Sequence, residues 1–152
     1  MLFEDEVTLG RALKDFTAKH KKNLGFVSLD VPLLSNLDVW VNIALIKQYH
    51  ENLSSDKAQK LVLSYLARYS LEDISNKRNP ALTNRERFCA MLLRAAMVRD
   101  SIVVIDRPFT IMPDIQDDRI IYDAVRTIDD SYRECHIFDY LWSKDRYRMI
   151  DL

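Results

Sequence analysis

Glycine is scarce in this chain: its 152 residues include only Gly10 and Gly25. A phosphate-binding loop needs several backbone amides to converge on the phosphates, and glycines permit that close approach. Neither a GxxxxGK(S/T) loop nor a GxGxxG loop occurs in the sequence. We therefore expect no phosphate cradle within these residues.

Cysteine, long apolar runs and an excess of one charge are also lacking. Cys89 and Cys135 have no CxxC spacing, which predicts two reduced core residues in a cytoplasmic protein rather than a disulfide. No apolar run approaches the roughly 20 residues that span a bilayer, so we expect no direct membrane insertion. The net charge of -1 gives no electrostatic reason to expect a nucleic-acid partner.

The most informative stretch runs from Leu82 to Phe109. Thr83 and Glu86 have the spacing of a capping box. The helix that follows carries apolar residues at helical spacing, namely Phe88, Met91, Leu92 and Ala95. Residues 102–105 form a β-branched run typical of a strand buried on both faces of a parallel sheet. Asp106 closes that strand at its carboxyl end, where open α/β sheets place their ligand chemistry.

This order of capped helix, apolar strand and terminal acid resembles the signature-to-Walker-B segment of the ATP-binding-cassette (ABC) ATPases. The residues that match this segment in register are Leu82, Glu86, Arg87, Arg94, Ala95, Asp106, Pro108 and Phe109. Residues 24–30, LGFVSLD, resemble the strand before the family's Q-loop. Residues 31–49 most resemble the ATPases of bacterial lipid-transport (MCE/Mla-type) systems.

The resemblance implies an α/β fold: a truncated P-loop-NTPase-like parallel sheet flanked by helices. It implies a single domain over 1–152, in which a helical subdomain of about 31–98 is inserted between core segments 1–30 and 99–152. We expect an N-terminal loop, a helix capped by Thr8, and strands at 24–28, 102–105, 134–138 and 146–150. The family's Walker A part is missing, which leaves an empty position in the sheet between the strand at 134–138 and the last strand. We predict that the last strand moves into this vacant place or that a partner chain supplies the missing strand.

Several positions depart from the family's catalytic pattern. The segment that begins at Thr83 and reaches Glu86 has Asn84 and Arg85 in place of the two signature glycines. Elsewhere Leu29 replaces the Q-loop glutamine, Arg107 the catalytic glutamate and Phe138 the switch histidine, while the D-loop keeps only Asp114. His136 is the alternative for a shifted switch histidine. Phosphoryl transfer needs a phosphate cradle, a held metal and a positioned water, so we expect no enzyme activity. Arg107 places a cation beside Asp106, and an ion pair between the two in an inactive site is the structural alternative for Asp106.

The region after the Q-loop receives the coupling helix of the permease in the family. Here that region supplies six apolar candidates for partner binding: Leu33, Leu34, Leu37, Val39, Trp40 and Ile43. The same residue types also form the core of a helical subdomain, and the sequence leaves both roles open.

Three hypotheses for function follow. The first is a non-catalytic subunit, peripheral at the inner face of the cell membrane, that docks on a permease or an active ATPase of a lipid-transport system. The second is a composite ATP site, in which Arg85 reaches a γ-phosphate by charge. The third is a free-standing domain with an unrelated regulatory role. We expect no cofactor for this chain alone. We expect ATP with Mg²⁺ to bind only if a partner supplies a Walker A motif.

Overall fold

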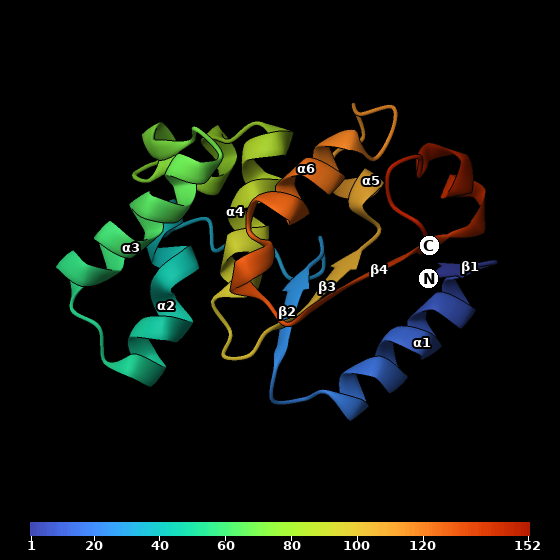
Figure 1. The fold of residues 1–152 in the computed structure, drawn as a ribbon, viewed down its shortest axis with the longest axis horizontal. Coiled ribbons are helices and arrows are strands. Elements are labelled where there is room, and N and C mark those ends of the chain that lie inside the picture. The colour runs from blue at the N-terminus through green and yellow to red at the C-terminus, as the bar shows by residue number, and fades with distance from the viewer.

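The computed structural model describes all 152 residues as a parallel sheet with helices on both faces (Figure 1). The strands are β1 (Leu2–Phe3), β2 (Leu24–Val27), β3 (Ile102–Asp106) and β4 (Glu134–Tyr140), in the spatial order β1-β4-β3-β2. The α-helices are α1 (Glu6–Lys19), α2 (Val39–Glu51), α3 (Ser55–Arg68), α4 (Asn84–Ala96), α5 (Pro108–Ile111) and α6 (Arg119–Thr127). Short 3-10 helices lie at Glu72–Ile74, Asn79–Ala81, Asp129–Ser131 and Leu141–Arg146.

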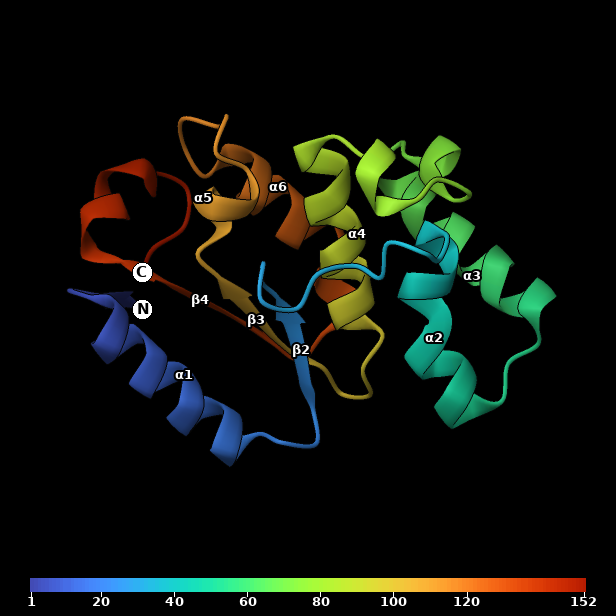
Figure 2. The ribbon, with the colours of Figure 1, turned by 180° about the vertical axis from the view of Figure 1, so that it is seen from behind.

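The helices divide between the two faces of the sheet. α1 contacts β4 and β1 on one face, and α4 packs on β2 and β3 on the other. Figure 2 shows the same arrangement from behind, with α2 and α3 beyond α4 on the side away from α1. This architecture confirms the expected parallel sheet flanked by helices, while the division into a core and a subdomain over 31–98 stays a prediction.

β3 is the central strand, and all five of its residues are buried. It pairs in parallel with β2 from Leu24↔Ile102 to Val27↔Ile105, and with β4 from Ile102↔Glu134 to Asp106↔Phe138. The expected strands at 24–28, 102–105 and 134–138 are therefore confirmed to within one or two residues.

The capping box of α4 is confirmed. The backbone N–H of Glu86 donates to the Thr83 hydroxyl over 3.2 Å, and the backbone N–H of Thr83 donates to the Glu86 carboxylate over 2.9 Å. Two amide groups that the helix leaves without partners are thereby satisfied. The four apolar residues predicted to line this helix are all buried: Phe88, Met91, Leu92 and Ala95.

The N-terminus differs from the expectation in two respects. Leu2 and Phe3 form a strand instead of a loop. Asp5, not Thr8, is the N-cap of α1, because its carboxylate accepts the Thr8 backbone N–H over 2.8 Å. Thr8 is the reciprocal partner in a capping box, which explains why the sequence places it near the helix start.

The prediction of a last strand at 146–150 is wrong, and that segment does not refill the vacant place. The backbone amides of Arg148, Met149 and Ile150 instead donate to the buried Asp118 carboxylate over 2.7–3.0 Å. The position beside β4 is taken by β1, in the register Leu2↔Asp139 and Phe3↔Tyr140. A carboxylate that accepts several amides satisfies them without a neighbouring strand.

The two glycines provide a matched test of how closely α4 packs on β2. A Cβ on Gly25 would lie 2.1 Å from the Ala95 carbonyl oxygen, whereas a Cβ on Gly10 would meet nothing within 4 Å. We expect Gly25→Ala to lower the free energy of unfolding by about 1–3 kcal/mol, because α4 must move away from β2. We expect Gly10→Ala to raise it by about 0.5–1 kcal/mol, since alanine is the better helix former.

Urea unfolding followed by circular dichroism measures both changes. Equal stability of Gly25→Ala and the wild-type chain would contradict the close approach of α4 to β2.

Candidate functional site at the carboxyl edge of the sheet

Asp106 is the centre of the carboxyl edge, and protein donors already surround its carboxylate. The residue is 3% exposed at the end of β3. The Ser28 hydroxyl donates to Oδ2 over 2.8 Å. The Arg107 guanidinium donates through Nε to Oδ1 over 2.8 Å and through Nη2 to Oδ2 over 3.1 Å. The expected Asp106–Arg107 ion pair is present, as a two-point contact.

Arg107 also connects this carboxylate to its neighbours. Its Nη2 lies 3.4 Å from Oδ2 of Asp30, and its Nη1 lies 3.4 Å from the Tyr140 hydroxyl. The hydrogen bond to Asp106 raises the pKa of Arg107, with the charge of Asp106 acting in the same direction. The backbone of Arg107 is left-handed, at φ 46°, a conformation that is costly for a residue with a Cβ.

The resemblance implies ATP with Mg²⁺ at this edge, and the residues present do not fit that metal. Mg²⁺ binds carboxylate oxygens in nearly ideal octahedral geometry. Here both oxygens of Asp106 accept hydrogen bonds from Arg107, and the carboxylate of Asp30 is paired with the same guanidinium. No group of three or more His, Cys, Asp or Glu side chains is placed to hold a metal ion.

Phe138 is part of the core at the position expected for a switch histidine. Its ring lies 5.7 Å from that of Phe3 and 5.5 Å from that of Phe16. His136 projects to the same face, since its ring packs against Phe16 at 4.8 Å. His136 pairs in register with Val104, two residues before Asp106, and its Nε2 contacts Glu134 over 2.8 Å. The histidine therefore lies in mid-strand, away from the carboxyl edge.

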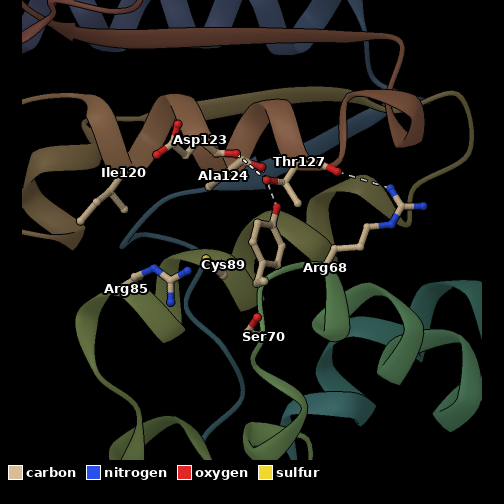
Figure 3. Close-up of a pocket in the computed structure, with 9 residues that line it drawn as sticks. Arg68, Ser70, Arg85, Cys89, Ile120, Asp123, Ala124 and Thr127 are labelled. Atoms are coloured by element: carbon tan, nitrogen blue, oxygen red, sulfur yellow. Dashed lines mark hydrogen bonds between the residues drawn. The ribbon is translucent and has the colours of Figure 1, made fainter.

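The positions of the signature segment separate into two groups. Asn84 lies beside Asp114, to which its side-chain amide donates over 3.0 Å. Arg85 is exposed and lines a cavity of about 300 Å³ between α4 and α6, shown in Figure 3. Cys89 lies in the same cavity, where burial raises the pKa of its thiol to about 12. The structure thus brings Asn84 and Asp114 together and places Arg85 elsewhere.

Sequence reasoning missed three residues of the site: Ser28, Asp30 and Tyr140. Ser28 and Asp30 flank Leu29 just after β2, and Tyr140 ends β4. Parallel strands end at the same edge of a sheet, and ligand chemistry gathers there. Polar residues at the ends of these strands were therefore a usable signal. Leu29, the predicted site residue between them, is 52% exposed.

The six partner-binding candidates divide by burial. Leu33, Val39 and Ile43 are almost fully buried, as the core role requires. Trp40 is half-buried against the core, and Leu37 is also half-buried. Leu34 is 49% exposed, so it is the member of the set that offers most of its side chain to a partner.

The loop that presents Leu34 is held by a buried asparagine. Asn42 is 4% exposed. Its side-chain oxygen accepts the Leu34 N–H over 2.8 Å, and its amide donates to the carbonyls of Leu34 and Leu37 over 3.1 and 3.2 Å. These bonds fix the segment between β2 and α2.

The fold is that of an ABC transporter ATP-binding cassette, present in part. A solved structure described as the dimer of MJ0796, a bacterial ABC transporter cassette, has a TM-score of 0.58 at 17% identity and covers 84% of this chain. The same cassette in a post-hydrolysis state with ADP and Pi has a TM-score of 0.56 at 18% identity, again over 84% of this chain. The ATP-binding subunit of another ABC transporter has 0.56 at 13% identity, over 88% of this chain.

In each comparison the match covers 56% of the solved chain, so this chain spans just over half the length of those cassettes. At these identities the likeness is one of fold. No known family profile matches the sequence, and no curated protein is significantly similar to it. None of the helices is long and apolar enough to cross a membrane.

The Asp106–Arg107 pair can be tested by a double-mutant cycle. Arg107→Ala leaves a buried carboxylate without its cation, and its Cβ keeps the left-handed strain unchanged. We expect Arg107→Ala to lower the free energy of unfolding by about 2–3 kcal/mol. This is less than the roughly 3–5 kcal/mol lost when a fully buried pair is broken, because Arg107 is partly exposed.

Asp106→Asn in the Arg107→Ala background removes the unpaired charge, so we expect it to restore part of that loss. Urea unfolding of the four proteins gives the coupling energy. A coupling energy near zero would mean that Arg107 does not stabilise Asp106.

Proposed function

We propose that this chain is a non-catalytic, ABC-ATPase-like subunit of a transport system, which docks on a membrane permease or on an active ATPase partner. The observation that carries the proposal is the guanidinium of Arg107, which pairs with both Asp106 and Asp30. A nucleotide-bound metal at this edge would have to displace an internal cation held at 2.8 Å. A site filled in this way favours a structural role over hydrolysis.

The start of α1 supports the same proposal. Phosphates bind where a helix N-terminus follows a strand, because free amides and the helix dipole favour negative charge. Here only Glu4 and Asp5 separate β1 from α1. The Asp5 carboxylate already accepts the hydrogen bond of the Thr8 backbone N–H, and Glu4 and Glu6 add two further negative charges. A phosphate would be repelled from this helix end.

A surface groove supports the docking part of the proposal. The groove, which we call the α2–β2 groove, has a volume of about 280 Å³. Its apolar lining comes from β2, the segment after it, α2, the end of α4 and the link that follows α4, and consists of Leu24, Phe26, Val31, Leu45, Ile46, Ala95 and Val98. Val31 and Leu45 are 43% and 48% exposed, and Leu34 lies on the held loop nearby. Exposed apolar clusters of this kind mark interaction sites.

The identity of the partner follows from the resemblance. The stretch 31–49, which includes Val31 and Leu45, corresponds to the part of the family that receives a permease coupling helix. The sequence of this stretch most resembles that of lipid-transport ATPases. We therefore propose lipid as the cargo and the cytoplasmic side of the membrane as the location. ATP and Mg²⁺ enter this function only through a partner that brings its own Walker A motif.

One contact favours the composite ATP site as a second candidate. Asn84 and Asp114, at the signature and D-loop positions, are joined by a 3.0 Å hydrogen bond. In the family each signature faces the other subunit's nucleotide, so this pair could still meet a partner. Arg85, which was to supply the charge, lies instead in the cavity between α4 and α6.

Nucleotide binding separates these functions. With a fluorescent ATP analogue and Mg²⁺, we expect no saturable binding by the purified chain, using an intact ABC ATPase as the positive control. Saturable binding to the chain alone, competed by ATP, would overturn the proposal. Binding only after an intact ATPase partner is added, and lost in an Asn84→Ala variant, would establish the composite site.

Docking is tested with a purified ABC transporter permease in detergent, by measuring the affinity of this chain for it. We expect Leu45→Asp to weaken binding at least about tenfold, since a charge would be buried in the interface. Leu63→Asp is the matched control, because Leu63 lies on α3 outside the groove and is 39% exposed. Equal affinity of the two variants would rule out the α2–β2 groove as the docking site.

A further inference from the structure

A second cavity lies at the end of the sheet opposite Asp106. It has a volume of about 500 Å³, within the range of ligand-binding pockets. It forms where the α1–β2 link, the end of α2 and the α4–β3 link meet, at the lower edge of the molecule in Figure 1. Ile46, Met97 and Val98 supply its apolar lining. We call this cavity the basic end, for the polar residues described next.

Two of the five polar residues around the basic end, Lys22 and Arg99, are cations. Lys22, His50 and Arg99 line it together with one acid, Glu51. Glu51 is paired with Lys47 at 3.7 Å. Lys22 and Arg99 have no carboxylate within 4.0 Å, since neither occurs in any ion pair of the structure. Two uncompensated cations therefore face one cavity.

The backbone that carries these cations is fixed. The Asn23 side chain donates to the Arg99 carbonyl over 2.9 Å, and the Asn23 carbonyl accepts the Ile102 N–H over 2.7 Å. The α1–β2 link is thereby tied to the α4–β3 link. The backbones of Lys22 and Arg99, next to these bonds, therefore lie close to one another.

The basic end continues into the α2–β2 groove. Ile46 and Val98 line both cavities. One continuous surface thus runs from cationic residues at Lys22 and Arg99 to apolar residues at Leu45 and Val31. The two halves differ in chemistry and share a wall, so a single elongated partner can contact both.

We propose that the occupant of this surface is a segment of a partner protein that carries a short apolar stretch next to acidic residues. The apolar stretch lies in the α2–β2 groove, and the carboxylates pair with Lys22 and Arg99. The proposal rests on the docking function above and adds the chemistry of the docking segment. Charge complementarity of this kind fixes the register of a complex and excludes wrong partners.

A protein segment fits this surface better than a lipid does. Pockets for small ligands enclose most of the ligand surface. Here Leu45 and Val31 remain about half exposed along the apolar part, which leaves an alkyl chain in contact with water. A folded segment can cover these side chains with its own.

Two synthetic 15-residue peptides test the proposal on the full chain. Both carry the same Leu- and Phe-containing apolar stretch, and one ends in three Glu residues while the other ends in three Lys residues. At 50 mM NaCl we expect the Glu peptide to bind about fivefold to tenfold more tightly, from two exposed ion pairs. The preference should shrink at 500 mM NaCl, because salt screens exposed charges.

Variants then locate the effect. We expect the double variant Lys22→Glu with Arg99→Glu to reverse the preference toward the Lys peptide, since both side chains are exposed and the fold should be retained. Lys60→Glu is the control, because Lys60 is an exposed cation of α3 that lines neither cavity. We expect it to leave the preference unchanged.

The other outcomes decide either against the proposal or against the function on which it rests. Equal affinity of the two peptides, or failure of both to bind, would overturn it. Binding to vesicles of anionic phosphatidylglycerol but to neither peptide would make the surface a lipid site. Detection of ATP binding by the chain alone would remove the proposed function and leave the peptide preference standing, so the two failures are distinguishable.

Discussion

Complete burial of β3 is the constraint on which the rest of the structure depends. All five of its residues are buried, and the last of them is a carboxylic acid. A buried charge is tolerated only when it is paired and hydrogen-bonded. Asp106 meets this condition through Ser28 from the end of β2 and through Arg107. The ends of two strands and the following turn are therefore organised around one carboxylate.

The same constraint accounts for the unusual backbone of Arg107. Its left-handed conformation costs free energy, and such residues persist where their surroundings determine them. The backbone N–H of Arg107 donates to the Phe138 carbonyl over 2.8 Å, and its side chain returns to Asp106. The main chain of Arg107 thus connects the end of β3 to β4, and its side chain neutralises the charge of Asp106.

The central part of the fold could be predicted from the sequence because its signals are local. The capping box at Thr83 and Glu86, the helix after it, and the β-branched run of β3 are each set by neighbouring residues. The relation of Asp106 to Arg107 also followed, since the two are adjacent in the chain. The core role of Leu33, Val39 and Ile43 was one of two alternatives, and only tertiary packing could decide between them.

The edges of the fold were mispredicted because they depend on distant partners. β1 has only two residues, too few to show the alternation of apolar and polar residues that predicts a strand. It is a strand because it pairs with Asp139 and Tyr140. Residues 146–150 have the composition of a strand, but Asp118, about 30 positions earlier, accepts their amides. Ser28 and Asp30 joined the site for the same reason: the parallel register, which no single segment reveals, brings the end of β2 next to Asp106.

The two ends of the sheet show opposite electrostatic states, and that contrast supports the proposed docking role. At the carboxyl edge the charges are satisfied internally, since Arg107 and Ser28 use the lone pairs of Asp106. At the opposite end Lys22 and Arg99 have no internal counter-ion and border an apolar surface. A site that is complete has little to offer a ligand, whereas uncompensated charge beside exposed apolar area gains free energy when a complementary partner covers it. The surface that remains to be satisfied is therefore the one beside α2 and β2.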